Sequence, residues 1–268
     1  MQYKYIFSDI DGTFLNSDHE ILSSTKNTVK QLTKNGLYFI LVSARMPSAM
    51  YNLTQDWLPA MPIIAYGGSL IMNEEKQIIY DQKINKDTSQ QIIKDMKAKY
   101  TDWVINFYHN DNWYVEDDTL AEVRNEESIV NVKAQKRDFD DLLKENILPN
   151  KLLCINKSGI SEQEQFSLQQ KYPDLKIIRS SNILLEIMDK DISKAKAVDR
   201  LLAYYRGQIK NAMAFGDNYN DLDMLQSVGL GIVMGNAPQE IKSMVKKVTL
   251  SNDEDGIYIA LKNLNLVK

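Results

Sequence analysis

The stretch YKYIFSDIDGTFLNSD, residues 3–18, decides how this chain folds. The run YKYIF ends abruptly at Asp9 and Asp11, which are followed at once by Gly12 and Thr13. Because side chains alternate along an extended strand, Asp9 and Asp11 are expected to point to the same side. This stretch alone fits an ordinary Asp-Gly turn at a strand end as well as a strand that delivers two carboxylates to a site. The rest of the chain decides between these interpretations.

Composition limits the classes of function that are available. The chain has 268 residues, of which 44% are apolar and 25% charged, and its formal net charge is −4. This balance is typical of a globular protein and gives no global electrostatic signal for binding nucleic acid or an anionic membrane. The longest uninterrupted apolar stretch, LYFILV, is too short to span a bilayer, and no secretory leader is expected. The single cysteine, Cys154, predicts a buried strand residue in a reducing cytoplasm.

The pattern along the chain predicts an α/β fold with an inserted domain. Residues 1–81 alternate strands and helices: a helix over 22–35, a doubly buried strand LYFILV, a helix over 47–57 and a strand PIIAY. This pattern resumes after about residue 191, with a helix from Lys194 and strands AMAF and GLGIVM. Residues 82–190 instead mix helices and hairpins. We therefore predict one parallel-sheet core from 1–81 and 191–268, and an α+β domain over 82–190.

The hairpin WVINFYHNDNWYVE within the inserted domain is rich in aromatic residues. Alternating aromatics on a hairpin usually pack one face against the domain's own helices, although a ligand platform is the alternative. We predict packing residues. The set comprises Trp103, Phe107, Tyr108, Trp113 and Tyr114.

Four polar motifs follow predicted core strands or begin a helix. Ligands of parallel α/β sheets bind at the carboxyl ends of the strands, so this placement is informative. The motifs are DIDGT with Asp9 and Asp11, SAR with Ser43, DISKAKAV with Lys194, and FGDNYND with Asp217 and Asp221. The Lys194 helix is expected to be capped by Asp191 or Ser193, which would add an ammonium group to the positive end of the helix dipole.

This combination suits phosphoryl transfer. An aspartate that attacks a phosphate dianion meets a repulsion of roughly 4 kcal/mol per charge pair at 4 Å and an effective dielectric near 20, so cations must offset it. The oxygen set of Asp9, Asp11 and Asp217 is typical of a Mg²⁺ site, because this ion prefers carboxylates, water and substrate phosphate. Lys194 and Ser43 would then hold the remaining phosphate oxygens.

These four motifs in this order resemble those of the haloacid dehalogenase superfamily, and the segments NAPQEIK (236–242) and NDEDGIYIAL (252–261) are similar to its Cof-type sugar-phosphatase-like subfamily. The resemblance covers essentially the whole chain. It implies a Rossmann-like core, a mobile cap inserted between the second and third motifs, a Mg²⁺ cofactor and an aspartyl-phosphate intermediate. It also implies that Asp9 is the nucleophile and that Asp11 is the general acid and then the base, with its backbone carbonyl as a further metal ligand.

The resemblance also assigns the other motif residues. It implies that Ser43, Lys194 and Asn220 contact the phosphate, that Asp217 binds the metal, and that Asp221 supports the metal or Lys194. Asn236 in MGNA would be a phosphate-side or structural contact.

Some positions differ from the family pattern. Gly67-Gly68-Ser69 stands where many relatives have Asn-Gly-Ala, so a side-chain amide near the substrate is missing, although Gly67 keeps a substrate-side place. Asp191 and Ala195 replace the usual glycines around Lys194. Arg45 is a second substrate-side candidate, and a structural salt bridge is an equally good interpretation.

We therefore predict a cytoplasmic Mg²⁺-dependent phosphatase whose partner is a small phosphate ester, most plausibly a sugar phosphate, and neither nucleic acid nor a membrane. One alternative is a phosphomutase of the same superfamily, which would return the phosphoryl group to a sugar instead of transferring it to water. A phospho-responsive binding module, in which the aspartate is phosphorylated as a signal, is the alternative of another class. The acid/base at Asp11 and the large inserted domain argue against that module.

Overall fold

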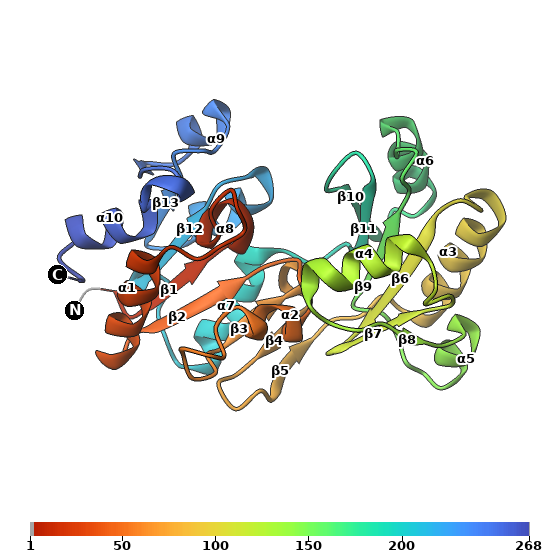
Figure 1. Cartoon of the computed structure of the whole chain (residues 1–268), viewed down its shortest axis with the longest axis horizontal. Coiled ribbons are helices and arrows are strands. Elements are labelled where there is room, and N and C mark those ends of the chain that lie inside the picture. Colours follow the sequence, from red (N-terminus) through yellow and green to blue (C-terminus); the bar gives the residue numbers. More distant parts are fainter. Residues whose placement is uncertain (1–2, 268) are drawn as a thin grey trace. The chain divides into compact units, whose positions relative to one another are not determined.

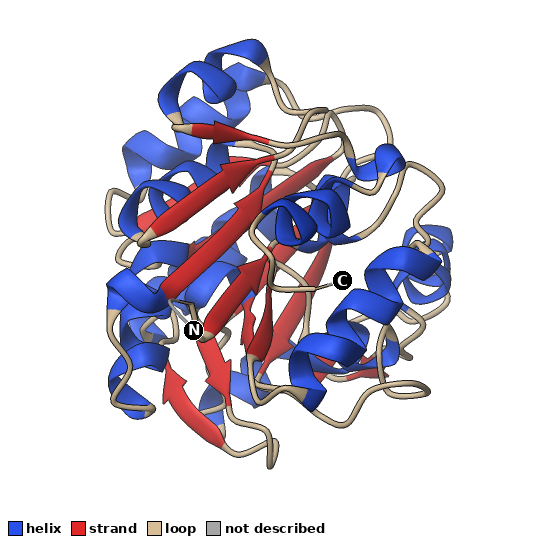
Figure 2. Ribbon diagram, turned by 90° about the vertical axis from the view of Figure 1, so that its left-hand side faces the viewer, coloured by secondary structure: helices blue, strands red, loops and turns tan. Residues whose placement is uncertain are grey.

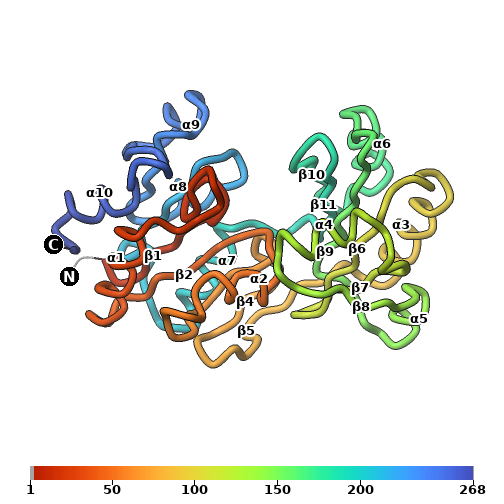
Figure 3. The backbone as a smooth tube through the Cα atoms, viewed as in Figure 1, coloured from red at the N-terminus to blue at the C-terminus, as the bar shows by residue number. Residues whose placement is uncertain are grey.

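The computed structural model of the chain describes residues 3–267, and most of its helices and strands are labelled in Figure 1. The chain forms two compact units. The first unit comprises the described parts of Met1–Ala44, Thr54–Tyr80 and Ser193–Lys268, and the second comprises Arg45–Leu53 and Asp81–Ile192. The chain therefore changes unit four times, and Figure 3 lets the reader follow this path by colour.

An eight-stranded sheet forms the centre of the first unit, in the order β14-β13-β12-β1-β2-β3-β4-β5. The pairings from β14 to β3 are parallel, and β4 pairs with β3 in the antiparallel direction. The mixed α/β architecture with a parallel-rich sheet confirms the predicted fold class. The strands are β1 (Tyr5–Ser8), β2 (Tyr38–Val42), β3 (Ile63–Ala65), β4 (Leu70–Met72), β5 (Ile78–Asp81), β12 (Ala212–Gly216), β13 (Leu230–Val233) and β14 (Lys247–Val248).

Helices lie on both sides of this sheet, as Figure 2 shows. Successive residues of a strand face opposite sides, so the continuous apolar run of β1 buries both of its faces. Tyr5 and Phe7 share one core cluster with Val198 of α7 and Leu225 of α8. The helices are α1 (Ser23–Lys34), α7 (Lys194–Tyr204), α8 (Leu222–Ser227), α9 (Gln239–Met244) and α10 (Gly256–Asn263).

The second unit is built on a six-stranded sheet in the order β10-β11-β9-β6-β7-β8. Its strands are β6 (Val104–His109), β7 (Asn112–Val115), β8 (Gln135–Lys136), β9 (Lys151–Ile155), β10 (Leu175–Arg179) and β11 (Leu184–Asp189). Its helices are α2 (Pro47–Asn52), α3 (Lys86–Lys99), α4 (Ala121–Val130), α5 (Phe139–Lys144) and α6 (Glu162–Lys171). Cys154 is fully buried in β9, as predicted.

The aromatic hairpin is β6–β7, and all five of its predicted packing residues are buried. Trp103, Phe107 and Tyr114 belong to the core cluster that also contains Phe139 of α5. Tyr108 and Trp113 face each other across the two strands with ring centroids 5.7 Å apart. The aromatics therefore stabilise this unit by packing.

Two segments differ from the predicted organisation. The helix predicted over 47–57 ends at Asn52, because the chain turns at Thr54, whose carbonyl accepts from the N–H groups of Trp57 and Leu58. The predicted core of 1–81 and 191–268 also included residues 45–53, which cluster with the second unit. No described helix has the length and hydropathy of a membrane span.

Candidate active site

The register of the first sheet brings the polar motifs to one edge. Ser8, the last residue of β1, pairs with Phe215 of β12 and Leu41 of β2. The next residue, Asp9, continues this ladder through its N–H, which donates to the carbonyl of Phe215 at 3.0 Å. Asp9, Ser43 and Asp217 therefore follow the carboxyl ends of three adjacent parallel strands, where ligands of such sheets bind.

Lys194 forms a buried ionic centre with two carboxylates. Its Nζ lies 2.5 Å from Asp9 Oδ1 and 2.5 Å from Asp221 Oδ1. The three side chains are between 1% and 9% exposed. Asp221 Oδ2 accepts from the backbone N–H groups of Asp217 and Asn218, each at 3.0 Å. Both oxygens of Asp221 thus hold protein groups, so this residue positions Lys194 and the loop after β12.

Local backbone structure delivers Lys194 to this centre. Ser193 is the N-cap of α7 and its hydroxyl accepts from the N–H of Lys196 at 3.1 Å, which confirms Ser193 of the two predicted caps. Gly68 has φ = 116°, and a Cβ there would lie 2.6 Å from the carbonyl oxygen of Ser193. A glycine at this position therefore allows the turn after β3 to approach the start of α7 closely.

Asp217 is held by the turn that follows Asp9. The hydroxyl of Thr13 donates to Asp217 Oδ1 at 2.8 Å. Gly12 has φ = 80°, and any Cβ there would collide with the carboxylate of Asp217. Asn236 donates from its amide to the carbonyl of Gly12 at 2.8 Å and accepts from the N–H of Asn252 at 3.1 Å. These two bonds support the structural interpretation of Asn236.

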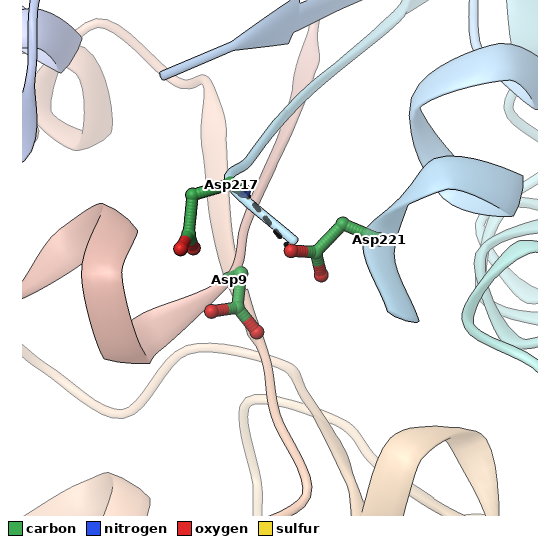
Figure 4. Close-up of side chains that lie close together, drawn as sticks. All are labelled: Asp9, Asp217 and Asp221. Carbon is green, nitrogen blue, oxygen red and sulfur yellow. Dashed lines mark hydrogen bonds between the residues drawn. The ribbon is translucent and has the colours of Figure 1, made fainter. Parts of the chain in front are cut away.

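Three carboxylates converge at this edge, as Figure 4 shows. Asp9, Asp217 and Asp221 each offer an oxygen, and these oxygens lie within 4.8 Å of one another. With Lys194 as the ammonium group between Asp9 and Asp221, the ionised cluster carries two excess negative charges. A buried excess of this size is unfavourable unless a cation offsets it, so the cluster could hold a divalent metal ion.

The pKa values follow from this crowding. Burial raises the pKa of Asp9 well above its usual range and the charge of Asp221 adds to the effect, while Lys194 opposes it. Burial alone would lower the pKa of Lys194, but the carboxylates of Asp221 and Asp9 raise it above its ordinary value, so the ammonium stays charged. Burial is also the largest cause that raises the pKa of Asp217 to about 6.

Other predicted site residues lie around this centre in different environments. Asp11 is exposed in the turn Ile10–Phe14, and its carboxylate is outside the cluster of three. Ser43 is buried, its N–H donates to the carbonyl of Ile64 at 2.9 Å, and its carbonyl accepts from the N–H of Gly67 at 2.8 Å. Asn220 is exposed in the turn Tyr219–Asp221.

Arg45 belongs to the second unit. Burial raises the pKa of Glu126 in that unit, and the charge of Arg45 partly opposes this rise. Sequence reasoning missed the part played by Thr13. Its place in the motif DIDGT, two residues after Asp11, was the available signal.

Comparison with known proteins defines the class. The family model of haloacid dehalogenase-like hydrolases matches residues 6–261, so the chain belongs to that family. Within the family it is a phosphatase: a Haemophilus influenzae protein named as a candidate phosphatase is 36% identical over 263 residues, covering 98% of both chains.

Solved structures show the same fold. The crystal structure of TM0651 from Thermotoga maritima matches with a TM-score of 0.86 and 27% identity, covering 97% of each chain. The subclass IIB sugar phosphatase BT4131 matches with a TM-score of 0.81 at 22% identity, covering 98% of this chain and all of its own.

Proposed function

We propose that this phosphatase is Mg²⁺-dependent and hydrolyses small phosphorylated metabolites, chiefly sugar phosphates, through a covalent aspartyl-phosphate intermediate formed on Asp9. One observation carries the proposal. Asp9 lies at the carboxyl edge of the sheet beside one fixed ammonium group and two further carboxylates. A nucleophilic carboxylate, a cation for the phosphate and oxygen ligands for a metal are what transfer of a phosphoryl group to an aspartate needs.

The donor set fits Mg²⁺. All three side chains offer carboxylate oxygens, and their charge exceeds that of Lys194 by two. Asp9 and Asp217 would hold the ion together with the backbone carbonyl of Asp11. Asp221 would support Lys194, because both of its oxygens are already engaged. When bound, the ion would offset the negative charge of the phosphate and keep Asp9 and Asp217 ionised.

The residues of the chain then divide the reaction into two steps. In the first, an Asp9 oxygen attacks phosphorus and the bond from phosphorus to the ester oxygen breaks, while Asp11 gives its proton to that oxygen. In the second, Asp11 takes a proton from water as the water oxygen attacks phosphorus, and the bond to Asp9 breaks. Lys194 and Ser43 hold the phosphate oxygens, with Asn220 as a further contact.

The inserted domain of residues 82–190 would recognise the leaving group, acting as a cap that excludes water and selects the substrate. A Bacillus subtilis relative, 26% identical over 263 residues, is named 5-amino-6-(5-phospho-D-ribitylamino)uracil phosphatase. That name supports a small phosphorylated metabolite as the substrate here. Arg45 and Gly67 stay candidates for the substrate side of the site.

The test is phosphate release from a panel of phosphorylated metabolites with Mg²⁺ and with EDTA. Activity on sugar phosphates that needs Mg²⁺ and disappears in Asp9→Asn would support the proposal. Asp56→Asn, which changes an exposed loop aspartate in the same way, is the matched control. Full activity in EDTA would contradict the metal assignment, and isomerised sugar phosphate without phosphate release would indicate a phosphomutase.

A further inference from the structure

The segment that follows the phosphate-binding serine is held by the second unit. Ser43 directly follows β2. Only Ala44 separates it from Arg45–Leu53, which belongs to the same unit as Asp81–Ile192. This segment contains α2, a helix of six residues. A helix of that length is not stable by itself, so its position depends on the groups that satisfy its ends.

The first turn of α2 has no cap of its own. Met46 is the N-cap residue but makes no side-chain capping bond, and Pro47 has no N–H, so the first helical donor is Ser48. Asp111, in the turn between β6 and β7, takes the role of the cap. Its Oδ1 accepts from the N–H of Ser48 at 2.7 Å and its Oδ2 accepts from the Ser48 hydroxyl at 2.6 Å. A carboxylate at a helix N-terminus is also favoured by the helix dipole.

The other end of α2 is held in the same unit. The amide of Asn52 donates to the carbonyl of Asn131, the left-handed C-cap residue of α4, at 3.0 Å. Both ends of the helix therefore depend on side-chain bonds made within the second unit.

The turn that carries Asp111 is itself braced. Asn110 has φ = 52° and its N–H donates to Asn150 Oδ1 at 2.7 Å. The amide of Asn150 donates in turn to Asp81 Oδ1 at 2.7 Å. One connected set of hydrogen bonds thus fixes the turn and Asp81, the residue at which the chain re-enters the second unit. Asp111 stands on a rigid support, which a residue that positions another segment needs.

We propose that Asp111 is a positioning residue for phosphate binding: by fixing Ser48 it fixes the backbone that leads back to Ser43. The assignment rests on the proposed function, in which Ser43 holds a phosphate oxygen. The sheet already holds the Ser43 backbone through Ile64 and Gly67, so loss of Asp111 loosens this segment without releasing it. We therefore expect substrate binding to weaken more than turnover.

The experiment compares Asp111→Ala, Ser48→Ala, the double variant and Asp111→Asn with the wild type. Hydrolysis of a small aryl phosphate gives kcat and KM, and hydrogen exchange follows the amides of residues 44–52. We expect Asp111→Ala to raise KM about three- to tenfold with a smaller change in kcat, and to speed exchange in this segment. Asn can still accept from the Ser48 N–H and can donate to its hydroxyl, so Asp111→Asn should restore KM to within about twofold.

The matched control is Asp117→Ala. Asp117 is partly exposed and, like Asp111, accepts from one backbone N–H and one hydroxyl, both of Thr119 in its own loop, at 2.9 and 2.6 Å. It should leave KM unchanged. If Asp111 acts through Ser48, Ser48→Ala should add nothing further to Asp111→Ala.

Two results would overturn the assignment: KM of Asp111→Ala equal to that of Asp117→Ala while Ser43→Ala is impaired, or unchanged exchange over residues 44–52. Failure of the proposed function is distinguishable, because it would appear as wild-type kinetics in Ser43→Ala or as no phosphatase activity in the wild type. Either of these would overturn the assignment of Asp111 together with the role of Ser43.

Discussion

Metal affinity should depend on pH through Asp217. Its pKa is raised to about 6, chiefly by burial, and a carboxylate must lose its proton to bind Mg²⁺. Below pH 6 Mg²⁺ competes with a proton for Asp217, so its apparent affinity falls in proportion to the fraction of Asp217 that is deprotonated. For a pKa near 6, lowering the pH from 7.5 to 5 should weaken apparent Mg²⁺ binding about tenfold, or about 1.4 kcal/mol. The pKa of Asp9 is also raised, so tenfold is the smallest effect expected.

Titration calorimetry of Mg²⁺ at several pH values between 5 and 7.5 measures this effect directly. Asp217→Asn, which has no titratable group at that position, should bind Mg²⁺ weakly and lose its share of the pH dependence. Asp253→Asn is a suitable control, because it changes an exposed carboxylate that accepts from Ser17. An affinity for Mg²⁺ that does not change between pH 5 and 7.5 would refute the reasoning.

The raised pKa of Asp217 also makes the stability of the metal-free protein depend on pH. The folded pKa of Asp217 is about 6 against an ordinary value of 3.8, so folding favours its protonated form. The stability associated with this group is present below pH 3.8 and is lost as the pH rises through 6, by up to about 3 kcal/mol. Bound Mg²⁺ should restore it, so the rise in Tm on adding Mg²⁺ should be larger at pH 7.5 than at pH 5.

Three further predictions test single residues. Lys194→Met should leave the fold intact but lower turnover about a hundredfold or more, because the phosphate then meets the carboxylates without its fixed cation. Lys196→Met, two residues along the same helix, is the control and should retain activity. Equal kinetics for the two variants would contradict the role of Lys194. Asp11→Asn should slow release of a sugar alcohol about a hundredfold or more while sparing the burst of nitrophenol from an aryl phosphate, since only the sugar needs a proton to leave. Rapid-mixing measurements compare the two substrates. An equal loss of rate with both would count against Asp11 as a general acid. Gly12→Ala should weaken Mg²⁺ binding in calorimetry, because its Cβ collides with Asp217, and unchanged binding would place that carboxylate outside the metal site.

Much of the fold could be read from periodicity, because burial imposes a pattern on each segment. The continuous apolar run LYFILV predicted the central parallel strand β2, and the helix predicted over 22–35 is α1, Ser23–Lys34. The end of α2 could not be predicted. It depends on the turn at Thr54 and on the bond from Asn52 to Asn131, a residue that lies far away in the sequence.

For the site, the sequence by itself determined which residues are available and that the ends of the core strands would carry them. Parallel strands end at one edge, so the motifs at Asp9, Ser43 and Asp217 had to approach one another once the strands paired. Only the tertiary structure decided how the carboxylates divide their work. Lys194 lies between Asp9 and Asp221, and the second oxygen of Asp221 holds the loop after β12, whereas Asp217 is bonded to Thr13. Sequence spacing does not encode these choices, because each depends on distances between segments that folding brings together from opposite ends of the chain.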